Sequence, residues 1–179
     1  MDQTCDAQAP GTAIIEWTVA KPGAVSAEGA VHGWFDSPLG PVLAIGDGSG
    51  LSALAFAAEH GREATFAAMA KRFAEAPLPA RPEALRRDVE AALSGSAPVR
   101  ARVAGSAFDI RVWQALLTIP PGRVTSYGAL AQALGKPDGA RAIGQALKRN
   151  PLALVIPCHR VVAADGTPGG YRWGLSVKD

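Results

Sequence analysis

Two short helical patterns separated by a tight break are the feature that most constrains the fold. Residues 126–149 read SYGALAQALGKPDGARAIGQALKR. Ser126 is a good N-cap for a first helix, which Gly-Lys-Pro interrupts after Leu134. Asp138 is a good N-cap for a second helix, which Asn-Pro terminates after Arg149. Two short helices around a tight, glycine-containing turn predict a helix-turn-helix.

The charge of the chain is unevenly distributed. Residues 1–99 contain 7 Lys and Arg against 12 Asp and Glu, whereas residues 100–179 contain 11 against 4. The second helix of the pair carries Arg141, Lys148 and Arg149. A basic helix within a basic half indicates contact with a polyanion such as DNA. Most helix pairs do not bind DNA, and charge alone is equally compatible with a solvated basic face.

The N-terminal part of the chain predicts a small α+β lobe. Residues 30–57 contain apolar stretches broken by the turn compositions SPLGP and GDGSG, which indicate an antiparallel sheet. Helical patterns follow in residues 61–75 and in PEALRRDVEAALSG, which stops at Gly95. Residues 1–29 carry few periodic signals, and we expect a loose leader there.

A different pattern begins at Phe108. The stretch FDIRVWQALLTI places apolar residues along one helical face and ends at Pro-Pro-Gly. The fold class that we expect is α+β. Its expected parts are a leader (1–29), an N-terminal α+β lobe (30–95), a strand and linker (96–106) and a C-terminal domain that contains the helix-turn-helix (107–179).

Composition indicates a cytoplasmic protein. No apolar run approaches the roughly 20 residues of a transmembrane helix, so we expect no membrane partner. The first residues, MDQTCDAQAPGT, lack the basic and apolar regions of a signal peptide. Thiols stay reduced in the cytoplasm, and we expect no disulfide between the two cysteines, Cys5 and Cys158.

Cys158 lies in the stretch NPLALVIPCHRVV, beside an imidazole and a guanidinium. Only the thiolate form of cysteine is a good nucleophile, and a nearby cation or base raises its population. Successive side chains of an extended segment point to opposite faces, so His159 reaches Cys158 only through a water or at a turn. A bare Cys-His pair is also compatible with a buried, inert cysteine beside two solvent-facing side chains.

The residues around Cys158 resemble the active-site signature of the O6-alkylguanine-DNA alkyltransferases, a family of DNA repair proteins, in its bacterial form. The matching letters are Ile-Pro-Cys-His-Arg-Val around Cys158, Asn150-Pro151 before it and Gly170-Tyr171 after it. The resemblance covers residues 108–178 and includes the stretches PGRVTSY, ARAIG and GYRWG. It implies a winged helix-turn-helix-like fold for the C-terminal domain.

The resemblance implies a suicidal reaction without a cofactor. An alkyl group passes from O6 of guanine, or O4 of thymine, in DNA to the sulfur of Cys158 in a single irreversible turnover. The resemblance makes His159 a base that acts through water, and it makes Asn150 the residue that holds the turn before the cysteine. Tyr127 would hydrogen-bond N3 of the guanine, which stabilises the leaving group.

The resemblance also implies how DNA is bound. The target atom lies inside the duplex, so the nucleotide must be rotated out. The helix-turn-helix would enter the minor groove of double-stranded DNA containing O6-alkylguanine, with Arg141 filling the vacated stack and the protein acting as a monomer. The implied DNA contacts are Ser126, Tyr127, Arg141 and Arg160, and the implied pocket residues are Leu147, Val161, Tyr171 and Arg172.

Two departures from the family pattern generate further expectations. The family's catalytic relay ends in a glutamate beyond the lysine matched by Lys178, and the sequence ends at Asp179. We therefore expect slower transfer, or a protein that binds alkylguanine with impaired transfer.

The residues are also compatible with a cysteine hydrolase or a sequence-specific regulator. No metal is expected, because Cys5, His32 and His60 are too few for the zinc site of some relatives.

Overall fold

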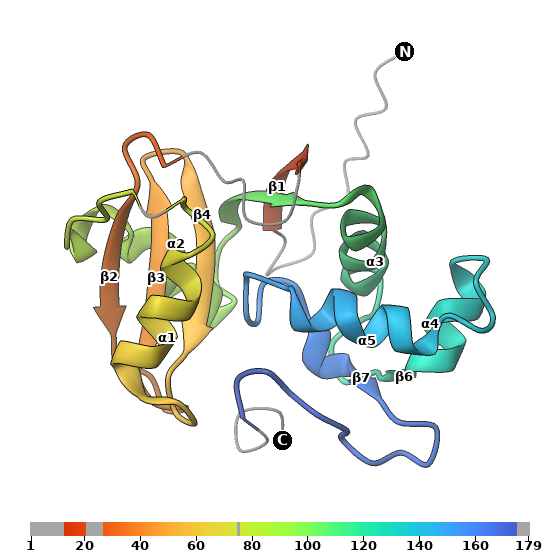
Figure 1. Ribbon diagram of the computed structural model, residues 1–179. Coiled ribbons are helices and arrows are strands. Elements are labelled where there is room, and N and C mark those ends of the chain that lie inside the picture. The colour runs from red at the N-terminus through yellow and green to blue at the C-terminus, as the bar shows by residue number, and fades with distance from the viewer. Residues whose placement is uncertain (1–12, 21–26, 75, 175–179) are drawn as a thin grey trace.

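The computed structural model describes residues 13–20, 27–74 and 76–174, which form a five-stranded sheet followed by a helical domain (Figure 1). Strands β2, β3 and β4 are antiparallel, whereas β4, β5 and β1 run parallel. The expected α+β class is confirmed, although the sheet is mixed rather than wholly antiparallel. Across the sheet the strands are β1 (Ala13–Val19), β5 (Val99–Gly105), β4 (Gly50–Phe56), β3 (Val42–Asp47) and β2 (Val31–Phe35).

Strand β1 corrects the expectation of a loose leader over residues 1–29. It pairs in parallel with β5, from Ala13 opposite Val99 to Val19 opposite Gly105. Its sequence AIIEWTV is rich in β-branched and aromatic residues and lies between the turn compositions APGT and AKPG, so local signals of a strand were present. The rest of the expected leader that falls on residues 1–12 and 21–26 lies outside the described residues. Strand β5 lies where a strand was expected within residues 96–106, and it belongs to the sheet.

Two helices complete the N-terminal lobe. Helix α1 (Gly61–Ala70) packs on β3 and β4, and helix α2 (Arg86–Ser94) packs on β4 and β5. A short 3-10 turn, η1 (Pro82–Ala84), precedes α2. Helix α2 ends as predicted at Gly95, whose φ of 64° is a left-handed conformation that glycine adopts readily. Strands β3 and β4 are almost wholly buried, and their residues belong to an apolar core that continues into the C-terminal domain.

The C-terminal domain contains the predicted helix-turn-helix. Ser126 caps the first helix as expected, because its Oγ accepts the backbone N–H of Ala129 at 3.1 Å. Asp138 does not cap the second helix; the turn places Gly139 at the N-cap position instead. The elements are α3 (Ala107–Leu117), β6 (Thr125–Ser126), α4 (Tyr127–Ala133), α5 (Ala140–Lys148), the 3-10 turn η2 (Cys158–Arg160) and β7 (Val161–Val162), which pairs with β6. Among the described residues, no helix has the length and apolar character needed to cross a membrane.

The segment between α5 and Cys158 is a turn docked on the sheet rather than a strand. The amide of Leu54 in β4 donates to the carbonyl of Pro151 at 2.8 Å, and the amide of Ala153 donates to the carbonyl of Leu54 at 2.8 Å. Leu154 then adopts a φ of 65°, which is uncommon for a residue other than glycine. The cysteine segment is therefore anchored to the sheet of the N-terminal lobe.

An ion pair between a buried carboxylate and a partly exposed guanidinium joins the end of α5 to the start of α3. The carboxylate of Asp109 is nearly inaccessible and accepts three hydrogen bonds from the guanidinium of Arg149, at 2.7 to 3.2 Å. Arg72, just beyond α1, donates to the carbonyls of Arg149 at 3.3 Å and Ala104 at 3.4 Å. These contacts fix the backbone immediately before Asn150, where the turn toward Cys158 begins.

Replacing Asp109 with alanine is expected to lower the free energy of unfolding by about 3 kcal/mol, because it leaves Arg149 without its buried partner. Arg86→Ala is the matched control, since it breaks an exposed pair with Glu90 (3.7 Å) of the kind that contributes less than about 1 kcal/mol. Urea denaturation followed by tryptophan fluorescence measures both changes. Equal losses in the two variants would show that the pair between Asp109 and Arg149 has no special role.

Candidate active site

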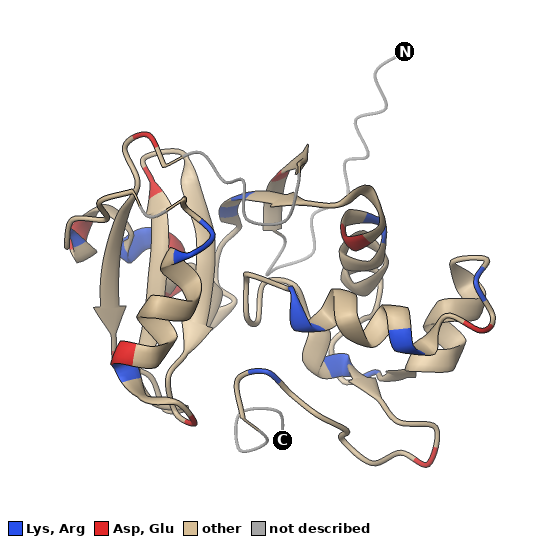
Figure 2. Ribbon diagram, viewed as in Figure 1, with Lys and Arg blue, Asp and Glu red and all other residues tan. Residues whose placement is uncertain are grey.

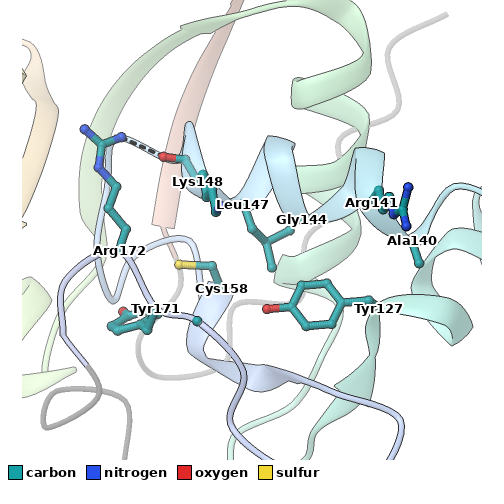
Figure 3. A pocket seen from close by; sticks show the side chains of 10 residues that line it. Tyr127, Ala140, Arg141, Gly144, Leu147, Lys148, Cys158, Tyr171 and Arg172 are labelled. Atoms are coloured by element: carbon teal, nitrogen blue, oxygen red, sulfur yellow. Dashed lines mark hydrogen bonds between the residues drawn. The ribbon is translucent and has the colours of Figure 1, made fainter.

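Cys158 is buried and lines a cavity of about 390 Å³ between α4, α5 and the loop after β7 (Figure 3). Pro157 precedes the cysteine at the N-cap position of η2, so the sulfur sits where the docked turn enters a 3-10 helix. The cavity is lined by Tyr127, Ala140, Arg141, Gly144, Leu147, Lys148, Cys158, Gly170, Tyr171 and Arg172.

The side chain of Asn150 holds the sulfur and the turn together. Asn150 is completely buried, and its Nδ2 donates to the Cys158 Sγ at 3.1 Å and to the Ile156 carbonyl at 2.9 Å. Its Oδ1 accepts the backbone N–H of Leu152 at 2.9 Å. A buried N–H that points at sulfur favours the thiolate over the thiol, because hydrogen bonding to the charged form stabilises that form. Asn150 therefore both shapes the turn and contacts the nucleophile.

Two tyrosine hydroxyl groups face the cavity from different elements. Tyr127 is the first residue of α4, and its hydroxyl points into the cavity in Figure 3. Burial raises the pKa of Tyr127, and the charge of Cys158 raises it further. Burial also raises the pKa of Tyr171, with further contributions from the charge of Cys158 and from a hydrogen bond to Cys158. Both phenols therefore stay protonated at neutral pH and can donate hydrogen bonds.

One face of α5 forms a wall of the cavity. Its lining residues recur three or four positions apart, which is the spacing of one helical face: Ala140, Arg141, Gly144, Leu147 and Lys148. In Figure 3, Leu147 reaches toward the space between Cys158 and Tyr127, whereas Arg141 lies at the end of the cavity remote from Cys158. In Figure 2, helix α5 is blue where it carries Lys or Arg, and no part of it is red, the colour of Asp and Glu.

Sequence reasoning found Arg141 and Leu147 on this wall but gave no role to Ala140, Gly144, Lys148 or Gly170. Helical spacing from Leu147 could have found Ala140 and Gly144, and helical spacing from Arg141 could have found Lys148. A Cβ added at Gly144 would meet the Tyr127 ring at 3.9 Å, which is an ordinary van der Waals contact, so a small side chain would fit at this position.

Five predicted site residues do not line the cavity: Ser126, Asn150, His159, Arg160 and Val161. His159 follows Cys158 in η2 and is half-buried. Val161 is wholly buried at the start of β7. The Nη1 of Arg160 donates to the carbonyl of Ile119 at 2.6 Å, and burial lowers the pKa of Arg160. The Arg160 guanidinium is thus bound at the end of α3.

The arrangement suits nucleophilic attack by sulfur. The cavity brings one thiol together with two phenol donors and with basic side chains, and no carboxylate is among its lining residues in the described part of the chain. Positive charge and hydrogen-bond donors around sulfur favour the thiolate. A phenol donor across the cavity can stabilise negative charge that develops on a leaving group.

Comparison with known proteins places this site in a family. Residues 107–179 match the family model described as 6-O-methylguanine DNA methyltransferase, DNA binding domain. A methylated-DNA–protein-cysteine methyltransferase of Mycobacterium leprae is 38% identical over 148 residues, which are 80% of this chain and 84% of the relative. The bifunctional transcriptional activator/DNA repair enzyme Ada of Escherichia coli is 57% identical over 76 residues, which are 42% of this chain but 22% of Ada. The chain thus spans about a fifth of Ada.

Solved structures agree with the sequence relatives. The crystal structure of Mycobacterium tuberculosis O6-methylguanine methyltransferase superposes with a TM-score of 0.67 at 35% identity, covering 83% of this chain and 88% of that chain. The structure of the M. tuberculosis protein in complex with DNA gives a TM-score of 0.63, covering 78% and 83%. The chain therefore belongs to the family of methylated-DNA–protein-cysteine methyltransferases.

Proposed function

We propose that this protein repairs double-stranded DNA by moving an alkyl group from O6 of guanine to the sulfur of Cys158. The transfer is irreversible and consumes one protein molecule per lesion. The protein is proposed to act as a monomer. No cofactor is needed, because the bond broken and the bond formed involve only the lesion and the thiolate.

The observation that carries this proposal is the buried sulfur that accepts a hydrogen bond from Asn150 while it faces an open cavity. The thiolate attacks the alkyl carbon, a new S–C bond forms and the C–O6 bond breaks. The electron pair of the broken bond stays on the guanine, which then takes up a proton. The product is a thioether, which water does not hydrolyse, so the protein has no route back to the free thiol. His159 is proposed to accept the thiol proton through a water.

Tyr127 is proposed to assist the departure of the guanine. Its hydroxyl faces Cys158 across the cavity, where the ring of an everted base would lie (Figure 3). A neutral phenol that donates to the base stabilises the negative charge left on the ring. Because the pKa of Tyr127 is raised, the donor persists through neutral and mildly alkaline pH.

Tyr127→Phe is expected to slow single-turnover transfer by about tenfold to a hundredfold, which corresponds to the loss of one hydrogen bond made in the transition state. Phenylalanine keeps the aromatic ring of the cavity wall and loses only the hydroxyl, so the fold and DNA affinity should be preserved. Rapid-quench measurement with a methylated duplex gives the rate, and fluorescence anisotropy gives the affinity. An unchanged transfer rate would remove Tyr127 from the chemical step.

DNA is proposed to contact α4 and α5 through its minor groove. Arg141 lies at the end of the cavity remote from Cys158, which suits a guanidinium that fills the stack left by the everted base. Ser126 supports this surface by capping α4. Minor-groove binding carries little sequence information, which is appropriate for a protein that finds lesions in any sequence.

Intact-mass analysis after incubation with an O6-methylguanine duplex tests the function. The expected result is a gain of one methyl group per protein molecule, saturating at equimolar lesion, with unmodified guanine left in the DNA. Tight binding without a mass change would instead support a protein that recognises damage and does not transfer. An unmodified duplex of the same sequence is the control and should leave the mass unchanged.

A further inference from the structure

The loop after β7 forms one wall of the cavity, although residues 163–174, all of them described, contain no helix or strand. Tyr171 and Arg172 are its contributions to the argument that follows, and both line the cavity. Within the loop, Gly166 and Gly169 adopt positive φ values of 82° and 64°, and glycine gives the backbone additional freedom. The position of Tyr171 therefore depends on contacts that the end of the loop makes.

The end of the loop is a four-residue turn that begins at Tyr171. The amide of Gly174 donates to the carbonyl of Tyr171 at 3.3 Å, so Arg172 and Trp173 occupy the two central positions of the turn. The side chain of Trp173 is buried in the apolar core. One central side chain thus packs in the core, and the other, Arg172, makes polar contacts.

Arg172 connects this turn to two helices. In Figure 3 its guanidinium is turned away from Cys158, and its Nη1 donates to the carbonyl of Lys148, the last residue of α5, at 2.7 Å. Its Nη2 contacts the sulfur of Met69, a buried residue of α1 in the N-terminal lobe, at 3.6 Å. The guanidinium carbon also lies 4.8 Å from the centre of the Trp173 ring. A single side chain therefore anchors the loop to both parts of the protein.

We propose that Arg172 is a positioning residue, which anchors the loop to α5 and α1 and so holds Tyr171 against the cavity for the transfer step. Tyr171 shares the cavity with Cys158, and a hydrogen bond to Cys158 is among the causes that raise its pKa. A phenol that donates to sulfur favours the thiolate, and it acts best when it is already in place before the reaction. This inference rests on the proposed function in taking Cys158 as the acceptor, whereas the anchoring contacts do not depend on that function.

Hydrogen exchange followed by mass spectrometry tests the anchoring without DNA. Arg172→Ala removes the contacts with Lys148 and Met69, so amides of residues 163–174 are expected to exchange about tenfold faster at short labelling times. Peptides from β3 and β4 should exchange as in the parent protein. Arg172→Lys keeps a charged donor for the Lys148 carbonyl and should recover at least half of the change. Unchanged exchange in Arg172→Ala, or an equal acceleration in β3 and β4, would overturn the anchoring role.

A double-mutant cycle tests whether Arg172 acts through Tyr171. Arg172→Ala and Tyr171→Phe are each expected to slow single-turnover transfer at saturating methylated duplex by about tenfold, and the double variant should be no slower than Tyr171→Phe. Affinity for an unmodified duplex, measured by fluorescence anisotropy, should stay within about threefold of the parent protein in all three variants. Losses that multiply to about a hundredfold in the double variant, or an unchanged rate in Arg172→Ala, would overturn the positioning role.

Arg87→Ala is the matched control, because it removes an arginine from an exposed position on α2. It should leave both the loop exchange and the transfer rate unchanged. Methyl transfer by the parent protein tests the proposed function separately. A parent that transfers while the two losses multiply would refute only the role of Arg172. A parent that does not transfer, while Arg172→Ala accelerates exchange in the loop alone, would refute the function and support the anchoring contacts.

Discussion

Replacing Cys158 with serine is expected to abolish alkyl transfer while DNA binding remains within about threefold of the parent protein. A serine hydroxyl is a very weak nucleophile without a strong base, and no other thiol lines the cavity in the described part of the chain. The sulfur is buried and contacts Asn150, so the nearly isosteric serine should preserve the fold. Single-turnover transfer and fluorescence anisotropy with the same methylated duplex measure the two properties.

The matched control is Cys5→Ser, because it removes the other cysteine of the chain. This variant should transfer one methyl group per molecule at the rate of the parent protein. Transfer that survives in Cys158→Ser, or that disappears in Cys5→Ser, would assign the acceptor to a different group.

Replacing Asn150 with alanine is expected to slow transfer by about a hundredfold, because each hydrogen bond to a charged group contributes about 1.5 to 3 kcal/mol. The substitution removes the Nδ2 donor from the Cys158 sulfur and leaves the Leu152 N–H and the Ile156 carbonyl without this partner. The free energy of unfolding should therefore also fall, by about 2 to 4 kcal/mol. Rapid-quench kinetics at neutral pH gives the transfer rate, and urea denaturation gives the stability.

Asn150→Asp separates the two roles of this residue. An aspartate retains the oxygen that accepts the Leu152 N–H but does not supply the N–H donor to sulfur. The profile of transfer rate against pH should shift to higher pH in this variant, because an unfavourable neighbour replaces a donor to the thiolate. Transfer within about threefold of the parent protein in both Asn150 variants would contradict an active role for the asparagine in the chemistry.

The sequence predicted those features of the fold, such as helix starts and ends, that depend on residues close together in the chain. Ser126 could be recognised as a cap and Gly95 as a helix end, because each satisfies a requirement of its own helix. Asp138 failed as a cap since the turn geometry moved the helix start by one residue to Gly139. Strand β1 was missed although its β-branched residues lie between two Pro-Gly turn compositions; only its pairing with β5, far away in the sequence, lacked a local signal. The docking of residues 151–153 on β4 likewise lacked a local signal.

The same contrast between local and long-range features applies to the candidate site. Through the resemblance, the motif around Cys158 predicted six residues that line the cavity, whereas five others that it implied do not line it. It did not predict that the Arg160 guanidinium is bound to the carbonyl of Ile119, which depends on how η2 packs against the end of α3. Nor did it predict that Arg172 contacts Met69 in the other lobe, because residues 103 positions apart carry no local signal of contact.

The most direct test of the account is to locate the transferred group. The protein is incubated with a duplex that carries isotopically labelled O6-methylguanine, digested with a protease and analysed by tandem mass spectrometry. The account predicts that the labelled methyl group is found on the sulfur of Cys158 and that no other peptide is labelled. Label on another residue, or an unlabelled Cys158 peptide after incubation with excess lesion, would contradict it.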